Sequence, residues 1–273
     1  MTASTDATDS TGSTGPTESS ERTLVAPGLR VGTRDGGRIE TWAIDNPERK
    51  NAITPDALRW MAHRASELSG QVVILRAHAG SFCSGFDLQA LRNALASGDE
   101  TLARAPDRPL MDATEAMQAA DASFIAVIHG YVIGAGVELC AACDFRFFAD
   151  DAWLMIPAAK LGVVYHAEGL RRIRAAFGPQ IVRRLVLGAQ RVPATELGST
   201  RGATALVSSA ELDAHAHSFA TELGTLDANA SRHNRRLLRA LDELELNPAM
   251  LEAHERARTA AYARVRSGDR DED

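Results

Sequence analysis

The residues best suited to chemistry are a glycine-rich turn and the carboxylate that follows it. Gly134 and Gly136 flank Ala135 in a tight turn, where the backbone can come close to a ligand. The apolar segment from Val137 predicts a helix that begins at this turn. The start of such a helix carries unpaired N–H groups, which suit a developing oxyanion. Glu138 lies on the first turn, so we expect its pKa to be raised by burial.

A purely structural interpretation of this turn is a glycine-kinked core helix whose glutamate interacts with the helix dipole. A second turn of the same kind favours chemistry instead. The segment Gly80–Leu88, G-S-F-C-S-G-F-D-L, also leads from an apolar strand through a glycine-containing turn into a helix. Two such turns predict two sets of exposed backbone N–H groups.

The overall composition is that of an ordinary globular enzyme. The 273 residues are 45% hydrophobic and 24% charged, and the net charge of -6 argues against a nucleic-acid binder. Cys140 and Cys143 have the spacing of a redox or metal pair, but no second pair or histidine cluster accompanies them. We therefore expect no metal, no disulfide framework and a reducing compartment. With neither a secretory signal nor an apolar run of ~18 residues, the sequence predicts a cytoplasmic protein.

The order of predicted elements indicates an α/β fold. Residues 1–27 are rich in Ser, Thr, Asp and Gly and are expected to be disordered. Asp35-Gly36-Gly37 predicts a hairpin between its flanking strands. Strands are expected at 29–33, 39–44, 72–75, 124–128, 145–148, 153–155 and 204–207. Helices are expected at 54–68, 88–95, 111–119, 137–143, 170–177, 180–187, 194–197, 210–223, 227–244 and 248–266. The alternation of strands and helices, followed by helices, predicts a helical appendage at the C-terminal end.

Four motifs then occur in order along the chain. They are N-P-E-R-K-N-A-I (46–53), F-C-S-G-F-D-L (82–88), H-G-Y-V-I-G-A-G-V-E-L-C-A-A-C-D (129–144) and I-P-A-A-K-L-G-V-V-Y-H-A-E-G-L (156–170). In this order and spacing, the chain resembles the enoyl-CoA hydratase/isomerase (crotonase) superfamily between about residues 28 and 207. The resemblance is far more specific than any one motif, although a fold does not by itself give the reaction.

The resemblance implies a crotonase-like spiral of ββα units over residues 28–193 and a helical trimerisation region over 194–273. It implies a homo-oligomer, either a trimer or a dimer of trimers. The net charge and the lack of a long apolar run predict no nucleic-acid and no membrane partner. The substrate would be an acyl-CoA thioester, and no cofactor would be needed because CoA is part of the substrate.

The resemblance also assigns individual positions. It places the oxyanion N–H groups on Ser84 and Ala135, which need only be small because the donors are backbone groups. The residues implied in CoA or substrate binding are Lys50, Asn51, Ala52, Gly85, Phe86, Asp87 and Gly134. Considered alone, Lys50 is better interpreted as a solvated loop charge.

The chain departs from the hydratase pattern at one position. Enoyl-CoA hydratases use two glutamates on one water, and Ala158 occupies the second position. Two-carboxylate addition of water is therefore not expected. His166 lies where the dienoyl-CoA isomerase and the chlorobenzoyl-CoA dehalogenase of this superfamily carry an aspartate. The segment L-G-V-V-Y, which ends at Tyr165, resembles the methylmalonyl-CoA decarboxylase branch. The candidate catalytic residues are thus Glu138, Tyr165 and His166.

Three of these side chains also have purely structural explanations. Tyr165 and His166 can be explained as loop packing, and Glu168, another possible acid, is better explained as a charge at a helix start.

Three functions stay open: a hydratase/isomerase-type enzyme that works through an enolate, a decarboxylase or other lyase, and a non-catalytic acyl-CoA-binding oligomer partner. Glu138 favours catalysis, because desolvating a carboxylate beside an oxyanion site costs free energy that a pure binder has no use for. Isomerisation, decarboxylation or a related enolate reaction is expected to exceed hydration.

Overall fold

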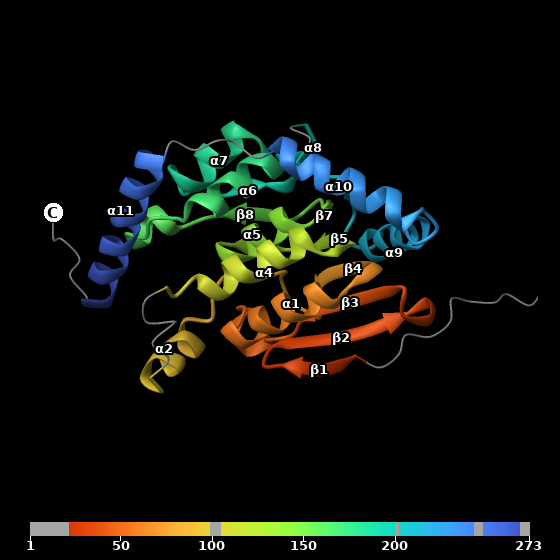
Figure 1. The fold of residues 1–273 in the computed structure, drawn as a ribbon, viewed down its shortest axis with the longest axis horizontal. Helices are drawn as coiled ribbons and strands as arrows, with labels where there is room; N and C mark the ends of the chain where they lie inside the picture. The colour runs from red at the N-terminus through yellow and green to blue at the C-terminus, as the bar shows by residue number, and fades with distance from the viewer. Residues whose placement is uncertain (1–21, 99–104, 200–201, 243–247, 268–273) are drawn as a thin grey trace, which may run out of the picture.

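The computed structural model describes residues 22–98, 105–199, 202–242 and 248–267. Within them, seven strands form a central sheet, with α1 and α4 packed together beside it (Figure 1). Its strands are β1 (Thr23–Ala26), β2 (Leu29–Arg34), β3 (Ile39–Ile44), β4 (Ser69–Ala77), β5 (Asp121–Ile128), β7 (Phe145–Ala149) and β10 (Ala205–Val207). A second sheet contains β6 (Tyr131–Ile133), β8 (Trp153–Met155) and β9 (Val192–Pro193).

Helices cover and connect the sheets. The described helices are α1 (Pro55–Glu67), α2 (Leu88–Ala96), α4 (Arg108–Ala119), α5 (Ala135–Ala142), α6 (Ala167–Phe177), α7 (Pro179–Val186), α8 (Ala194–Ser199), α9 (Leu212–Leu223), α10 (Ala228–Asp242) and α11 (Pro248–Ser267). Short 3-10 helices are η1 (Asp35–Gly37), η2 (Pro47–Arg49) and η3 (Ala158–Leu161). Within the described residues, no helix is both long and apolar enough to cross a membrane.

The central sheet is mixed: its antiparallel part lies at the β1 edge, and its parallel part extends from β3 to the β10 edge. Strand β3 pairs parallel with β4, β4 with β5, β5 with β7 and β7 with β10. The hairpin of β2 and β3 is antiparallel and turns at Asp35-Gly36-Gly37, as predicted. Parallel strands that run side by side bring their carboxyl ends to one edge, so the segments after β4 and β5 emerge as neighbours.

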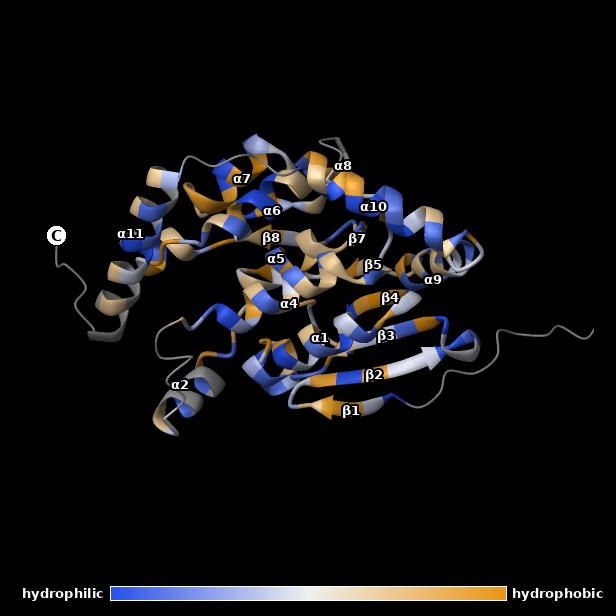
Figure 2. Cartoon of the chain, viewed as in Figure 1, coloured by the Kyte–Doolittle hydropathy of each residue, from blue (hydrophilic) through white to orange (hydrophobic). Residues whose placement is uncertain are grey.

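The core is built from apolar strands and large aromatic side chains. Trp42 is fully buried, and its ring meets Trp60 and Phe124 edge-on at centroid distances of 5.4 and 5.5 Å. Such edge-to-face pairs stabilise a core beyond the burial of their area. Figure 2 places hydrophobic residues along β4 in the middle of the fold and hydrophilic residues along α10 at its outer side. The predicted buried strand at 72–75 is thus confirmed and extends in both directions.

Two expectations need correction at the ends of the chain. Residues 23–26, expected to be part of a disordered tail over 1–27, form β1, which pairs antiparallel with β2. Leu24 and Val25 supply the β-favouring side chains that the Ser- and Thr-rich composition conceals. Residues 1–21 of the expected tail lie outside the described residues. Residues 194–273 were expected to form a helical region outside the core. The strand expected within it is confirmed as β10, but it pairs with β7 in the central sheet, so the core does not end at residue 193.

A buried asparagine organises the loop that precedes α1. Asn51 adopts a left-handed backbone conformation with φ of 57°, and the residue is 1% exposed. Its amide donates to the carbonyls of Ala79 (2.5 Å) and Ser81 (2.8 Å), and its Oδ1 accepts from the Asn46 N–H (3.0 Å). One side chain therefore fixes the 46–53 loop against the segment after β4. Thr54 then caps α1 by accepting from the Ala57 N–H.

We expect Asn51→Ala to lower the free energy of unfolding by about 2–3 kcal/mol, because it leaves buried backbone groups without partners. Urea unfolding monitored by circular dichroism measures this. Lys50→Ala is the matched control, because Lys50 has nearly the same backbone conformation, with φ of 55°, but an exposed side chain. That change should stay within about 0.5 kcal/mol of the wild type. Equal losses in both variants would show that backbone conformation, and not the side-chain contacts, dominates.

Candidate active site

The two glycine-containing turns lie side by side. The Cys83 N–H donates to the Tyr131 carbonyl at 3.3 Å, and the Ile133 N–H donates to the Cys83 carbonyl at 2.9 Å. A Cβ on Gly136 would lie 2.7 Å from Cys83 Cβ, so only glycine permits this approach. Ser84 and Ala135 thus follow on two chain segments that are hydrogen-bonded to each other. Within the described residues, neither of their backbone N–H groups has a backbone acceptor.

Both turns border one cavity of about 290 Å³. Seven of the residues singled out from the sequence line it: Ser84, Gly85, Phe86, Gly134, Ala135, Tyr165 and His166. Ala158, at the position of the second hydratase glutamate, also lines it and adds no carboxylate. The remaining wall is mainly apolar and includes Leu110, Ile133, Ile156 and Val163. The tertiary structure therefore joins three of the four motifs around one apolar space.

The proposed CoA-binding residues divide into two groups. Three of them, Gly85, Phe86 and Gly134, line the cavity. The other four are not among the described residues that line it: Lys50, Asn51, Ala52 and Asp87. Asn51 is the loop anchor described above, and Asp87 accepts from the Gln89 N–H at the start of α2. The 46–53 loop nevertheless lies beside the first turn, because the Ser84 hydroxyl donates to the Arg49 carbonyl at 3.1 Å. Lys50 is exposed on that loop.

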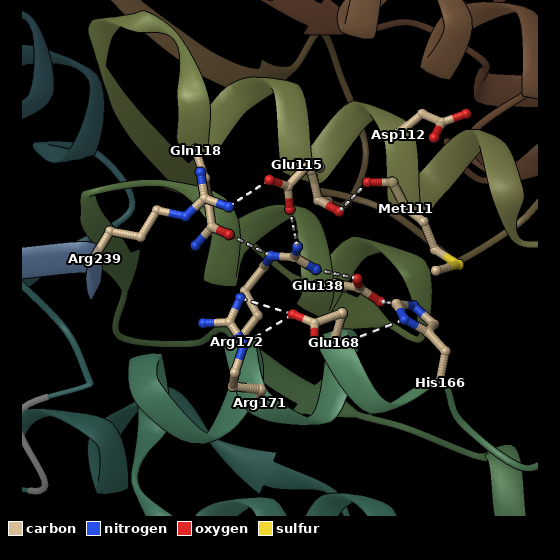
Figure 3. Close-up of polar contacts among 12 residues, drawn as sticks. Met111, Asp112, Glu115, Gln118, Glu138, His166, Glu168, Arg171, Arg172 and Arg239 are labelled. Atoms are coloured by element: carbon tan, nitrogen blue, oxygen red, sulfur yellow. Dashed lines mark hydrogen bonds and ion pairs between the residues drawn. The ribbon is translucent and has the colours of Figure 1, made fainter. Parts of the chain in front are cut away.

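Glu138 is placed behind the cavity rather than on its wall. The side chain is 0% exposed, and it is not among the described residues that line the cavity. Its Oε1 accepts from Arg172 Nη1 at 2.6 Å, and its Oε2 lies 3.0 Å from His166 Nε2 (Figure 3). Burial alone raises the pKa of Glu138, but His166, Arg172 and Tyr165 outweigh burial and lower it. The expectation of a raised pKa was therefore wrong, because the sequence did not show that His166 and Arg172 both contact this carboxylate.

His166 connects Glu138 to the cavity. It precedes α6 as its N-cap, where Nδ1 accepts from the Gly169 N–H at 3.0 Å. A nitrogen that accepts carries no proton, so the neutral ring has its proton on Nε2 and donates it to Glu138. The ring is also stacked on Tyr165, with centroids 5.4 Å apart and an interplanar angle of 14°. Both rings line the cavity, so the aromatic pair presents a fixed face to its contents.

Glu168 lies outside this arrangement. Its carboxylate contacts Arg171 at 2.8 Å and its side chain is 45% exposed. The structure thus agrees with the interpretation of Glu168 as a charge at the helix start.

Sequence reasoning missed two residues of the site. Arg172 is 2% exposed although its type is usually at the surface. Its signal was the spacing of Gly169, Ile173 and Phe177, which marks one buried face of α6 with Arg172 beside it. Asp107 lines the cavity and binds Arg258 of α11 with both oxygens at 3.0 Å. No local pattern in the sequence indicated this second pair.

We expect Glu138→Gln to lower the free energy of unfolding by roughly 3 kcal/mol, because it removes the close counter-charge of the buried Arg172 and leaves the more distant Glu115, at 3.9 Å. Glu168→Gln is the matched control, since it removes an exposed partner of Arg171 and should cost less than about 1 kcal/mol. Urea unfolding of both variants at pH 7 makes the comparison. Similar losses of unfolding free energy in the two variants would show that the buried Glu138–Arg172 pair contributes no more to stability than the exposed Glu168–Arg171 pair.

The same pair has a predictable pH dependence. The pKa of Glu138 is lowered on folding, so its stabilisation is fully present above its unfolded-state pKa and is lost as the pH falls through the folded-state pKa. The stability difference between wild type and Glu138→Gln should therefore shrink below about pH 4.5, the ordinary glutamate value. Chemical unfolding at several pH values checks this, and a difference that grows in acid would contradict the lowered pKa.

Relatives of the chain come from two branches with different reactions. Probable enoyl-CoA hydratase echA6 of Mycobacterium tuberculosis is 29% identical over 211 residues, covering 76% of this chain and 82% of that protein. Ethylmalonyl-CoA decarboxylase of Danio rerio is 31% identical over 189 residues, covering 63% of this chain and 58% of that protein.

Solved structures of other proteins share the fold of this chain. An enoyl-CoA hydratase/carnithine racemase from Magnetospirillum magneticum has a TM-score of 0.72 at 25% identity, covering 85% of this chain and 87% of that one. Methylmalonyl-CoA decarboxylase in complex with 2-nitronate-propionyl-CoA shares the fold, with a TM-score of 0.73 at 22% identity and coverage of 86% and 90%. The family model described as enoyl-CoA hydratase/isomerase matches residues 37–265. With its two paired turns on one cavity, the chain belongs to the enoyl-CoA hydratase/isomerase family.

Proposed function

We propose that the chain binds an acyl-CoA thioester with its carbonyl between the N–H groups of Ser84 and Ala135. Charge that develops on the thioester oxygen is stabilised there, so the reaction proceeds through an enolate. The reaction that the site supports best is decarboxylation of an α-carboxyacyl-CoA of the malonyl type. The observation that carries this choice is the engagement of Glu138 by Arg172 and His166 behind the cavity wall.

Hydration needs a base that activates water, and the site offers none in a suitable state. Ala158 replaces the second glutamate, and both oxygens of Glu138 already accept hydrogen bonds. Among the described residues, Asp107 is the carboxylate that lines the cavity, and it is held by Arg258. Decarboxylation requires no base, because the electrons of the broken C–C bond form the enolate as CO₂ leaves.

The apolar wall favours the same step. A substrate carboxylate beside Leu110 and Val163 loses its hydration, whereas CO₂ is neutral and the new charge moves to the thioester oxygen. The enolate must then take a proton on its α-carbon. A tyrosine hydroxyl stays neutral at pH 7, so Tyr165 suits either proton delivery or orientation of the leaving carboxylate. Likeness to ethylmalonyl-CoA decarboxylase of Danio rerio, at 31% identity, supports this reaction class.

The CoA moiety would lie along the 46–53 loop. Arg49 and Lys50 are exposed there, and the loop is fixed beside Ser84. CoA carries phosphate groups, which such cations bind well. A second candidate is acyl-CoA binding without turnover, which the ion-paired state of Glu138 also permits. The remaining candidate is the hydratase/isomerase chemistry of other family members.

We expect wild-type enzyme to release CO₂ from methylmalonyl-CoA or ethylmalonyl-CoA with kcat/KM at least ~10² above that for hydration of crotonyl-CoA, since general acid–base help to water is missing. Mass spectrometry of the thioester products measures both reactions. Ala158→Glu supplies the missing carboxylate and should raise crotonyl-CoA hydration. Crotonyl-CoA hydration above ~10⁶ M⁻¹s⁻¹ in wild type would restore the hydratase assignment, and tight binding without any turnover would favour the binder.

Tyr165→Phe should lower kcat for the preferred thioester by about 10², because it removes the hydroxyl and keeps the stacked ring. Steady-state kinetics and calorimetric binding of CoA separate turnover from affinity, and the affinity should not change. Tyr131→Phe is the control, since Tyr131 packs against Trp153 and is not among the described lining residues. An unaltered kcat in Tyr165→Phe would remove this hydroxyl from the reaction.

A further inference from the structure

Among the described residues, Arg172 is a deeply buried charged group whose role the proposed reaction leaves unexplained. Its side chain is 1% exposed. Nη1 donates to Glu138 Oε1 at 2.6 Å, and Nε donates to Gln118 Oε1 at 3.0 Å. On its other side, Nη2 lies 3.9 Å from Glu115, which in turn pairs with Arg239 of α10 (Figure 3). The Arg172 guanidinium therefore contacts side chains of two helices: Gln118 and Glu115 of α4, and Glu138 of α5.

This contact determines what Glu138 can do. Its two carboxylate oxygens are assigned to two different donors, Arg172 on Oε1 and His166 on Oε2. A carboxylate with a guanidinium at 2.6 Å stays ionised in a buried setting. Glu138 thus faces His166 as a permanent acceptor, which selects the ring form that has its proton on Nε2.

The surrounding backbone leaves His166 no other position. The Gly169 N–H occupies Nδ1 at 3.0 Å. A Cβ on Gly169 would lie 2.8 Å from Glu138 Oε2 and 2.8 Å from His166 Nε2, so the start of α6 packs directly against the pair. A ring with its proton on Nδ1 would lose the Gly169 bond and would turn an unprotonated nitrogen toward the Glu138 anion. Only the Nε2–H form satisfies all three groups.

We propose that Arg172 is a positioning residue: it holds Glu138 as a fixed anion, which orients His166 and, through ring stacking, fixes Tyr165 on the cavity wall. Glu138 then serves as an orienting group and not as the base that removes a proton. The consequence for turnover rests on the proposed decarboxylation, whereas the consequence for the His166 ring does not. The two can therefore be tested separately.

The experiment compares Arg172→Met, Glu138→Gln and the double variant in the full chain labelled with ¹⁵N-histidine. In Arg172→Met, burial without the cation should raise the pKa of Glu138 and partly protonate it. The imidazole ¹⁵N spectrum of His166 should then lose its single Nε2–H signature. Turnover of the best malonyl-type thioester should fall about 10²-fold in kcat, with KM within about threefold, since orientation and not affinity is lost.

The double variant provides the rescue. The amide oxygen that Glu138→Gln introduces still accepts from His166 Nε2–H, and no buried charge is left without a partner. We expect the double variant to recover the Nε2–H signature and a kcat within about tenfold of wild type, well above Arg172→Met, a non-additive result. Arg171→Met is the control on the same helix, because Arg171 pairs with Glu168, and it should resemble wild type.

Two results would overturn the proposal. One is an unchanged ¹⁵N signature and kcat in folded Arg172→Met. The other is a double variant as impaired as the worse single variant, which would make Glu138 itself the reacting base. If Arg172→Met does not fold, Arg172→Lys decides, because a retained cation should preserve the Nε2–H signature and its loss would contradict the proposal. Absence of decarboxylation in wild type would refute the proposed function alone, since the ring signature is read without substrate.

Discussion

The buried ion pair of Arg172 and Glu138 is the interaction on which the rest of the site depends. It joins α5 to α6 behind the cavity wall, and Gln118 ties it to α4. A buried pair of this kind is poor evidence for stability, because desolvating two charges offsets most of their attraction. Its effect is to specify one arrangement. With either partner missing, the other is a buried charge that has lost its closest counter-charge, so the pair favours the arrangement of helices in which both are present.

The two glycine-containing turns, which we propose bind the thioester oxygen, depend on the backbone and not on side-chain charge. Their functional groups are backbone N–H donors, so the requirement falls on chain geometry and on the absence of a side chain at Gly136. Hydrogen bonds between the Cys83 and Ile133 segments align the two turns. Ala135 and Glu138 lie on the first turn of the same helix, so the ion pair that holds Glu138 also holds the second of these turns in place.

The C-terminal helices are connected to the same centre. Arg235 of α10 donates to Asp144 and to the carbonyls of Met117, Gln118 and Ala120 at the end of α4. Arg239 reaches Glu115, and Arg258 of α11 holds Asp107 on the cavity wall. The chain's high arginine content thus has a structural use, since the guanidinium fork can satisfy several acceptors at once. The C-terminal helices α10 and α11 are therefore anchored to α4 and to the residue that precedes it.

Much of the fold was predictable from the sequence because local rules determine it. The hairpin at Asp35-Gly36-Gly37, the start of α1 after Thr54 and the apolar β4 and β5 each carry a signal within a few residues. The glycine turns around Ser84 and Ala135 were found for the same reason. β1 was missed because four residues in a polar tail give too little pattern, and β6 and β9 because strands of three and two residues need partners to exist.

The electrostatic state of Glu138 was decided only by the tertiary structure. Its type and its place on a first helical turn were evident from the sequence, and those features alone indicated a raised pKa. Arg172 lies 34 positions further along the chain, and nothing in the spacing of the two residues joins them. A pKa depends on the charges within a few ångströms, whichever part of the chain supplies them. The sequence therefore determined which groups are present, and folding determined which of them meet.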